Sequence, residues 1–450
     1  MGTPTAADTA WVLACTSLVF LMVPGVGFFY AGLLRHKNAL AMLWTALAVF
    51  AVASLEWVVW GFSLAFSERA SPLIGDLAHA AFAHVGAAPG AATDGLPQLV
   101  FAMYQSMFAA LTPVIACGAF ADRARLAPVI VFVWCWSTAV YSPLACWSWN
   151  PHGWLHTLGS LDYAGGSPVH ISSGTAALVI SVYLGRRHGW GTAHLTYRPH
   201  NVTHVVLGTF LIWAGWLGFN GGAGLHADAR AAHALVLTNV AACTGALTWM
   251  LLDFRHARKL SVVGLCSGAI AGLVAITPAS GFVRIPAALV FGALGAAAVN
   301  LATQLKRIFA YDDALDIFAA HGIGGIVGNL LTALFADGAV AALDGSDPTT
   351  AQGWINHHYI QLAHQLADSA AAFAWSLTLT ALFVAAIDHI PGLHFRASEA
   401  DELIGTDMAQ IGEEAYVLPL LTHAPDARLH TCVEVSECAD ARAPVSLADR

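Results

Sequence analysis

Eleven apolar runs, each long enough to cross a lipid bilayer, constrain the fold of this chain more than any other feature. A helix needs roughly 20 mainly apolar residues to span the hydrocarbon core. Only 10% of the 450 residues are charged, against roughly 25% in soluble proteins, so the apolar content is not one local anchor. The sequence therefore predicts an all-α polytopic membrane protein of the plasma or inner membrane, surrounded by the lipid bilayer. The runs are 11–33, 39–66, 97–120, 127–147, 169–184, 202–222, 232–252, 261–277, 286–305, 317–335 and 367–389.

Lys and Arg residues are distributed unevenly between the loops and predict the orientation. Loops after odd-numbered runs contain twelve of them, and loops after even-numbered runs contain three. Cytoplasmic loops carry an excess of Lys and Arg, so the N-terminus is predicted outside and the C-terminus in the cytoplasm. The first set is Arg35, Lys37, Arg123, Arg125, Arg186, Arg187, Arg198, Arg255, Arg258, Lys259, Lys306 and Arg307, and the second is Arg69, Arg230 and Arg284.

The order of the runs predicts a transmembrane domain at 1–390 and a cytoplasmic tail at 391–450. The tail is polar, and we expect it to be ordered to about residue 416 and flexible beyond. Runs one to five and six to ten form two five-helix inverted repeats in this interpretation, with the eleventh as an extra helix. One similarity between the halves is that Asp162 precedes His170 and Asp316 precedes His321.

His170 and His321 lie inside apolar runs, where ionisable groups are costly. One interpretation is that each makes a structural hydrogen bond between helices. The other is that matching positions in a repeat bring the two together in a functional site, and we favour this one. Desolvation favours the neutral imidazole, which has one donor and one acceptor nitrogen. Two such rings in contact would pass a small hydrogen-bonding molecule or a proton.

Aromatic residues gather at the predicted outer ends of the runs. Tyr104 and Phe108 are four residues apart and share a helix face, Trp149 ends the fourth run, and Phe219 lies near the end of the sixth. These residues are compatible with an ordinary interfacial belt and with a cation–π site worth ~0.5–2 kcal/mol. Composition does not choose between the two.

Two acids have no partner that the sequence can name. Asp162, in LDYAGG, is as consistent with a helix cap or an acceptor for backbone donors as with a direct substrate contact. Glu56 lies in the middle of the second run.

Several site types are excluded by missing motifs. The sequence has no HExxH or GxSxG motif, its cysteines lack metal-site spacing, and it has no extensive basic patch. We therefore expect no enzyme activity, no cofactor, no metal and no nucleic-acid partner.

Long collinear motifs resemble the ammonium transporter family (Amt, Mep and Rh proteins) from about Trp11 to Tyr416. The matching stretches are MVPGVGFFYAGLLRHKN (22–38), WVVWGFSLAFSE (57–68), TPVIACGAFADR (112–123), LDYAGGSPVHISSG (161–174), GWLGFNGG (215–222), CSGAIAGLVAITPASG (266–281) and DDALDIFAAHGIGGIVG (312–328). The resemblance implies an ammonium transporter or ammonia channel that forms a homotrimer with one pore per subunit.

The resemblance also implies roles for individual residues. Trp149 matches the outer cation-binding tryptophan, and it would recruit ammonium together with Phe108 and Asp162. Phe108 and Phe219 match the stacked pair that closes the pore. The twin pore histidines, which would line the path and relay a proton, match His170 and His321.

Two positions depart from the family pattern. Many members have a hydroxyl residue where this chain has Ala223. The tail motif GTDMAQIGEEAY (405–416) has Ile411 where histidine is usual. Some members are regulated by a P-II-class protein that docks on the cytoplasmic face, and this chain is a candidate for such regulation.

Three alternatives stay open from the sequence. The first is an intramembrane enzyme, and the second is an ammonium sensor that signals through its tail. The third is a channel for neutral gas like the Rh proteins, and the missing hydroxyl at Ala223 makes this alternative less remote.

Overall fold

The computed structural model describes residues 5–192 and 198–416, and within these it contains eleven helical spans long and apolar enough to cross a membrane. This confirms the predicted all-α fold and the number of spans. The flexibility predicted for the tail beyond 416 concerns residues outside the described part. In chain order the spans contain α1 (Ala6–Phe20) and α2 (Met22–Leu33); α3 (Ala39–Glu56), η2 (Trp57–Gly61) and α4 (Phe62–Phe66); α5 (Gln98–Cys117); α6 (Leu126–Trp136), η4 (Ser137–Tyr141), α7 (Ser142–Trp149) and α8 (Trp154–Leu158); η5 (Gly166–Ile171) and α9 (Ser172–Leu184); α10 (Val202–Gly221); α11 (Ala229–Ala257); α12 (Val262–Ile276) and η6 (Thr277–Ala279); α13 (Ile285–Ala302) and α14 (Leu305–Ile308); η7 (Phe318–Ile323) and α15 (Gly324–Phe335); and α17 (Gln361–Asp388).

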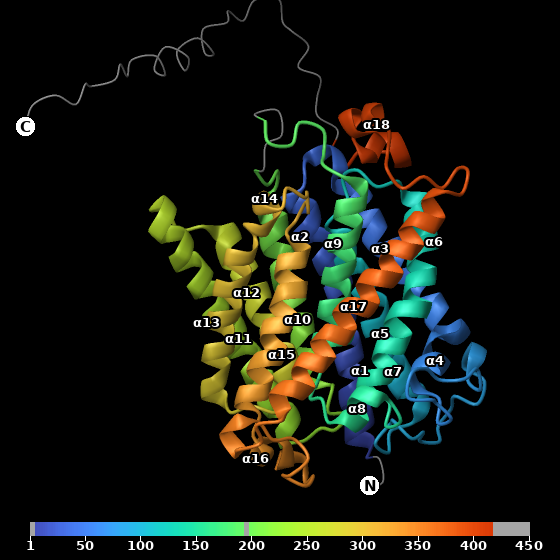
Figure 1. Cartoon of the computed structure of the whole chain (residues 1–450), viewed down its shortest axis with the longest axis vertical. Coiled ribbons are helices and arrows are strands. Elements are labelled where there is room, and N and C mark those ends of the chain that lie inside the picture. Colours follow the sequence, from blue (N-terminus) through green and yellow to red (C-terminus); the bar gives the residue numbers. More distant parts are fainter. Residues whose placement is uncertain (1–4, 193–197, 417–450) are drawn as a thin grey trace, which may run out of the picture. The chain divides into compact units, whose positions relative to one another are not determined.

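The helices form one bundle within residues 5–415 (Figure 1). In this bundle α10 packs against α2, α11 against α12 and α13, and α17 runs obliquely across α9 and α15. The short helix α18 (Glu399–Ile404) lies at the end that holds Arg35, Arg123 and Arg187, which we call the basic end. The start of α1, with α8 and α16 (Gly338–Ala341), lies at the opposite end.

Two spans begin in the same unusual way. Both η5 and η7 are π-helical turns, a widened form that is often found at functional sites. The Asp162 carboxylate accepts a hydrogen bond from the Ser167 backbone N–H at 2.7 Å, and the Asp313 carboxylate accepts one from the Phe318 N–H at 2.8 Å. Asp313 lies as far before His321 as Asp162 lies before His170.

The repeat partner of Asp162 is therefore Asp313, and the prediction that Asp316 corresponds to Asp162 was wrong. Asp316 lies only two residues before η7, too close to its first turn to accept from the same N–H. Its carboxylate instead pairs with the Lys306 ammonium at 2.8 Å.

Candidate functional site

An aromatic pocket of about 130 Å³ lies at the end opposite the basic end. Helix α5 supplies one wall of this pocket, because residues at helical spacing along it turn toward the same side. Trp149, the last residue of α7, supplies another part. The lining residues are Ala92, Phe101, Tyr104, Gln105, Phe108, Trp149, Tyr163, Ala164, Ala223 and Leu225.

Trp149 is held in place by a backbone oxygen. Its indole N–H donates to the Asp162 carbonyl at 3.0 Å, and the Phe108 ring stands edge-on to it with ring centres 5.9 Å apart. The indole is thus held beside Phe108 in the wall of the pocket.

The Asp162 side chain serves the backbone in this structure. Its carboxylate accepts hydrogen bonds from the N–H groups of Gly165, Gly166 and Ser167, each at 2.7 Å. Burial raises the pKa of Asp162 above its ordinary value, although these three donors act in the opposite direction. Asp162 does not line the aromatic pocket, so any effect on a bound ion acts through its charge and through the carbonyl that holds Trp149.

Phe108 and Phe219 close the inner side of the aromatic pocket. Their ring centres are 4.1 Å apart with 29° between the planes, and both side chains are buried. The Tyr104 hydroxyl donates to the Phe219 carbonyl at 2.7 Å, which fixes α10 against α5 at this level. The two rings therefore fill the space between the aromatic pocket and His170.

The two histidines contact each other on the side of this stack that faces the basic end. Nδ1 of His170 and Nδ1 of His321 are 3.2 Å apart, and the His170 ring centre lies 6.3 Å from that of Phe219. One Nδ1 must donate and the other accept, so the rings are opposite tautomers and present one acceptor and one donor Nε2. Nε2 of His170 is buried and has no hydrogen-bond partner in the protein.

Trp216 was missed as part of this site by sequence reasoning. Its ring stacks on His170 with ring centres 5.3 Å apart, and its indole N–H donates to the Thr277 hydroxyl at 2.9 Å. The available signal was its spacing of three residues from Phe219 on one helix face. Trp216 therefore fixes the plane of the His170 ring.

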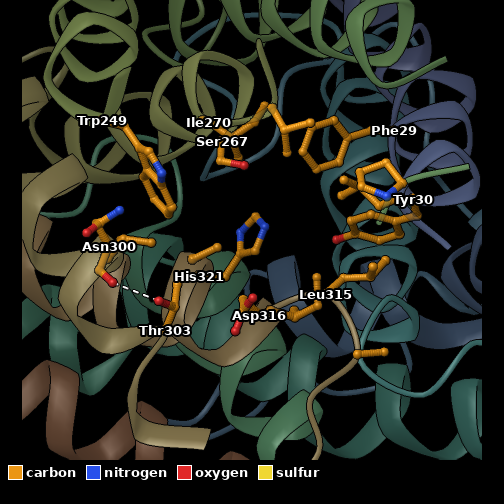
Figure 2. Close-up of a pocket in the computed structure, with 18 of the residues that line it drawn as sticks. Phe29, Tyr30, Trp249, Ser267, Ile270, Asn300, Thr303, Leu315, Asp316 and His321 are labelled. Carbon is orange, nitrogen blue, oxygen red and sulfur yellow. Dashed lines mark hydrogen bonds between the residues drawn. The ribbon is translucent and has the colours of Figure 1, made fainter. Parts of the chain in front are cut away.

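A second cavity, of about 930 Å³, opens on the side of the histidines that faces the basic end. Figure 2 shows the His321 ring projecting into it, with Asp316 nearby and Trp249 and Tyr30 on opposite walls. His321 therefore lines this cavity, and the His170 ring lies next to Phe219, which stacks on the pocket residue Phe108. No cluster of metal-ligating side chains occurs in the described residues.

Gln105 was also missed by sequence reasoning. Its side-chain oxygen is buried without a hydrogen-bond partner, and it lines the same pocket as Ala223. An unpaired buried acceptor costs ~1–3 kcal/mol unless a ligand satisfies it. The pocket therefore has an acceptor although position 223 lacks a hydroxyl.

Glu56 now has a partner. The Thr138 hydroxyl donates to its carboxylate at 2.8 Å and accepts from the Trp60 indole N–H at 2.8 Å. Glu56 lines neither cavity, so these contacts assign it a structural role between the second and fourth spans.

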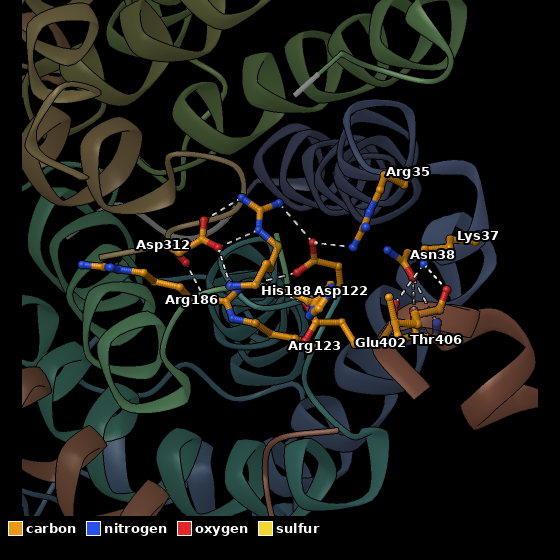
Figure 3. Close-up of polar contacts among 12 residues, drawn as sticks. Arg35, Lys37, Asn38, Asp122, Arg123, Arg186, His188, Asp312, Glu402 and Thr406 are labelled. Carbon is orange, nitrogen blue, oxygen red and sulfur yellow. Dashed lines mark hydrogen bonds and ion pairs between the residues drawn. The ribbon is translucent and has the colours of Figure 1, made fainter. Parts of the chain in front are cut away.

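The basic end has a buried ion-pair network (Figure 3). Arg187 donates to both carboxylate oxygens of Asp312, at 2.6 and 2.8 Å, and to Asp122 at 3.0 Å. Burial raises the pKa of the Asp312 carboxyl, but the hydrogen bond and charge of Arg187 outweigh it and hold that pKa below its ordinary value. The same balance holds for Asp122, with Arg187 and Arg123 as the cations.

The tail motif contacts this end. The Asp407 carboxylate accepts from the N–H groups of Leu40 and Ala41 at 3.1 and 2.7 Å and so caps α3. The Thr406 N–H donates to the Asn38 side chain at 3.0 Å. Residues 405–411 are therefore tied to the start of the second span.

Comparisons with known proteins identify the family of this chain. The sequence profile of the Ammonium Transporter Family matches residues 10–416. Ammonium transporter 1 of Schizosaccharomyces pombe is 50% identical over 418 residues, which cover 93% of this chain and 84% of that protein. Ammonium transporter MEP2 of Saccharomyces cerevisiae is 47% identical over 416 residues, which cover 91% and 83%. The crystal structure of Candida albicans Mep2 has a TM-score of 0.85 at 46% identity, and it covers 92% of this chain and 90% of that chain. The chain belongs to the ammonium transporter family.

Proposed function

We propose that this protein transports ammonium across a cell membrane, with its basic end in the cytoplasm, and that it works as a homotrimer. The names of its relatives and the excess of Lys and Arg at that end support the proposal. The family is one of transporters, which excludes the intramembrane-enzyme alternative.

The proposed mechanism follows from the cost of moving a charge. An isolated ion in a low-dielectric medium costs on the order of tens of kcal/mol, whereas neutral ammonia costs far less. Ammonium can shed its charge as a proton, and a potassium ion of similar size cannot. An apolar constriction with neutral hydrogen-bonding groups therefore selects for ammonia.

The entry step uses the aromatic pocket. Ammonium binds against Trp149 and Phe108 and donates a hydrogen bond to the free side-chain oxygen of Gln105. Gln105 thus replaces the hydroxyl that many relatives carry at the position of Ala223. The proton leaves near Asp162, whose charge favours a cation at this end.

The passage step uses the histidine contact, which is the observation that carries the proposal. Ammonia passes the Phe108–Phe219 stack when the rings move, and then hydrogen-bonds to the acceptor and donor Nε2 atoms of the pair. When the acceptor Nε2 of one ring takes up a proton, the Nδ1 proton of that ring can pass to the other Nδ1, 3.2 Å away, and the second ring then releases its Nε2 proton. The rings exchange tautomers in this relay, which offers a separate route for the proton. Transport by both routes together is electrogenic.

Regulation is proposed at the tail motif. Residues 405–411 contact the start of the second span, so a P-II-class protein that bound there would act on a segment already tied to the helices. Signalling by this chain as a sensor would use the same surface.

The test replaces both His170 and His321 by Ala in proteoliposomes. We expect the ammonium-evoked current to fall and selectivity over potassium to weaken. Unchanged current with unchanged selectivity would refute the role of the pair. The charge moved per ammonia molecule transported distinguishes this mechanism from a neutral-gas channel, because such a channel carries no current.

A second variant tests entry. Gln105→Ala should raise the ammonium concentration that gives half-maximal current, while maximal current changes less. Gln98→Ala is the matched control, because Gln98 donates to Glu68 outside the aromatic pocket. Equal effects of the two variants would contradict the role of Gln105.

A further inference from the structure

Asp368 is a buried acid that neither the mechanism nor the family motifs use. It lies on α17, the helix outside the two repeats, and its side chain is fully buried. Its Oδ2 accepts a hydrogen bond from the Ser160 hydroxyl at 2.7 Å, whereas its Oδ1 has no hydrogen-bond partner.

A short polar network joins Asp368 to Asp162. Ser160 precedes Asp162 by two residues, and the Ser167 N–H donates to the Asp162 carboxylate. The Asn329 side chain donates to the Ser167 hydroxyl at 2.9 Å and lies 3.5 Å from Asp368 Oδ2. The Asn329 side-chain oxygen is also buried without a partner. Both carboxyl groups are therefore held in one cluster.

The cluster contains no balancing cation. Among the ion pairs of residues 5–192 and 198–416, none involves Asp162 or Asp368. The other titratable groups on α17, or on elements packed against it, are His156, Cys135, Tyr141, His170, Tyr183, His364 and Asp388. Two like charges in one buried site repel, so such pairs hold one proton between them.

The hydrogen bonds of the two carboxyl groups indicate that Asp368, rather than Asp162, carries this proton. Both oxygens of Asp162 accept from backbone N–H groups, so a proton there would displace a donor. Asp368 Oδ1 is free to carry it, and the Asn329 oxygen in the same cluster lacks a donor. Ser160 is partly exposed and hydrogen-bonds to Asp368, which provides a path for exchange with the solution.

We propose that Asp368 carries the exchangeable proton of a carboxyl pair with Asp162, and that its loss at higher pH strengthens ammonium binding at Trp149. The acid becomes a carboxylate and a proton passes to the outer solution. The second negative charge then lies behind the carbonyl that holds the Trp149 indole. Asp368 is a positioning residue, and this inference rests on the proposed function.

The experiment compares wild type with Asp368→Asn, which keeps the shape and cannot ionise. The half-saturating ammonium concentration is measured from currents in proteoliposomes across a range of outside pH. The proportion of ammonium to ammonia is the same for both proteins at each pH. Its effect therefore cancels when the half-saturating concentration of the variant is divided by that of the wild type. We expect the half-saturating concentration of Asp368→Asn divided by that of the wild type to be near one at acidic pH. At alkaline pH this ratio should rise about fourfold, the effect of one charge ~20 Å away at an effective dielectric constant of ~20.

Ser369→Ala is the matched control, because Ser369 contacts Asn329 but does not titrate. It should follow the wild-type pH profile. A ratio for Asp368→Asn that is constant with pH, whatever its value, would overturn the inference, since a purely structural role predicts that result.

Ser160→Ala keeps the test decisive if Asp368→Asn does not assemble. The hydroxyl stabilises ionised Asp368, so its loss should move the midpoint of the pH profile upward. An unmoved midpoint would contradict the role of Asp368. Absence of saturable ammonium current in the wild type would instead overturn the proposed function.

Discussion

Gly174 lies where α9 and η7 approach most closely, next to the histidine contact. A Cβ at Gly174 would lie 2.1 Å from the Gly322 backbone nitrogen, whereas ordinary contact begins at 3.4 Å. Gly174→Ala must therefore separate the two segments by about 1.3 Å, the difference between these distances. Overpacking of this kind costs ~1–3 kcal/mol of stability.

The separation should break the contact between the histidines. Their Nδ1 atoms are already 3.2 Å apart, and hydrogen bonds fail beyond about 3.5 Å. A hydrogen bond of this kind is worth ~0.5–1.5 kcal/mol net. If that energy is lost where ammonia passes, transport should slow by roughly two- to twelvefold, since 1.4 kcal/mol corresponds to a factor of ten.

The assay is ammonium-evoked current in proteoliposomes at equal protein content, with the unfolding temperature measured in detergent. Gly86→Ala is the control, because no atom lies within 4 Å of its added Cβ. We expect the control to match the wild type in both measurements. Wild-type current in folded Gly174→Ala would refute the reasoning, because it would show that transport does not depend on this close approach.

Three further predictions follow from the buried charges and the aromatic pocket. Arg187→Ala leaves Asp122 and Asp312 buried without their main cation and should cost ~3–5 kcal/mol of stability, measured by thermal unfolding. Exposed Arg69→Ala should cost much less, and equal losses would contradict the network. Because Asp122 and Asp312 have pKa values below their ordinary ones, their contribution is present above an unfolded pKa of ~3.9 and is lost as pH falls through the folded values. The unfolding temperature of the wild type should therefore fall as the pH is lowered below about 4. An equally steep fall in Arg187→Ala would argue against this cause. Ala223→Ser should lower the half-saturating ammonium concentration several-fold by adding an acceptor worth ~1 kcal/mol, and an unchanged value would show that a hydroxyl there does not reach the ion.

Local features were predictable from the sequence. The eleven spans were predicted because hydropathy sums over adjacent residues, and most predicted ends lie within a few residues of the helices. The largest difference at a helix start is in α17, which begins at Gln361 rather than at 367. Gln361 and Gln365 are polar and lowered the hydropathy of this stretch, but they are buried against the loop before η5.

The contacts of the site were less predictable. His170 and His321 were selected as a pair because ionisable residues are costly in apolar runs, and the resemblance supplied Trp149, Phe108 and Phe219. Trp216 and Gln105 were not selected, because an aromatic ring or an amide in an apolar run has many ordinary roles. Only their neighbours in space reveal the stacked ring and the unpaired oxygen.

The sequence by itself determined the class of fold, the number of spans and the most costly buried groups, since each depends on the composition of a continuous segment. Only the tertiary structure decided which buried groups meet. Residues 151 positions apart bring two Nδ1 atoms to 3.2 Å, Asp313 rather than Asp316 repeats the role of Asp162, and Asp368 joins Asp162 from the extra helix. The physical reason is that a hydrogen bond depends on distances of a few tenths of an ångström between helices, which hydropathy does not encode.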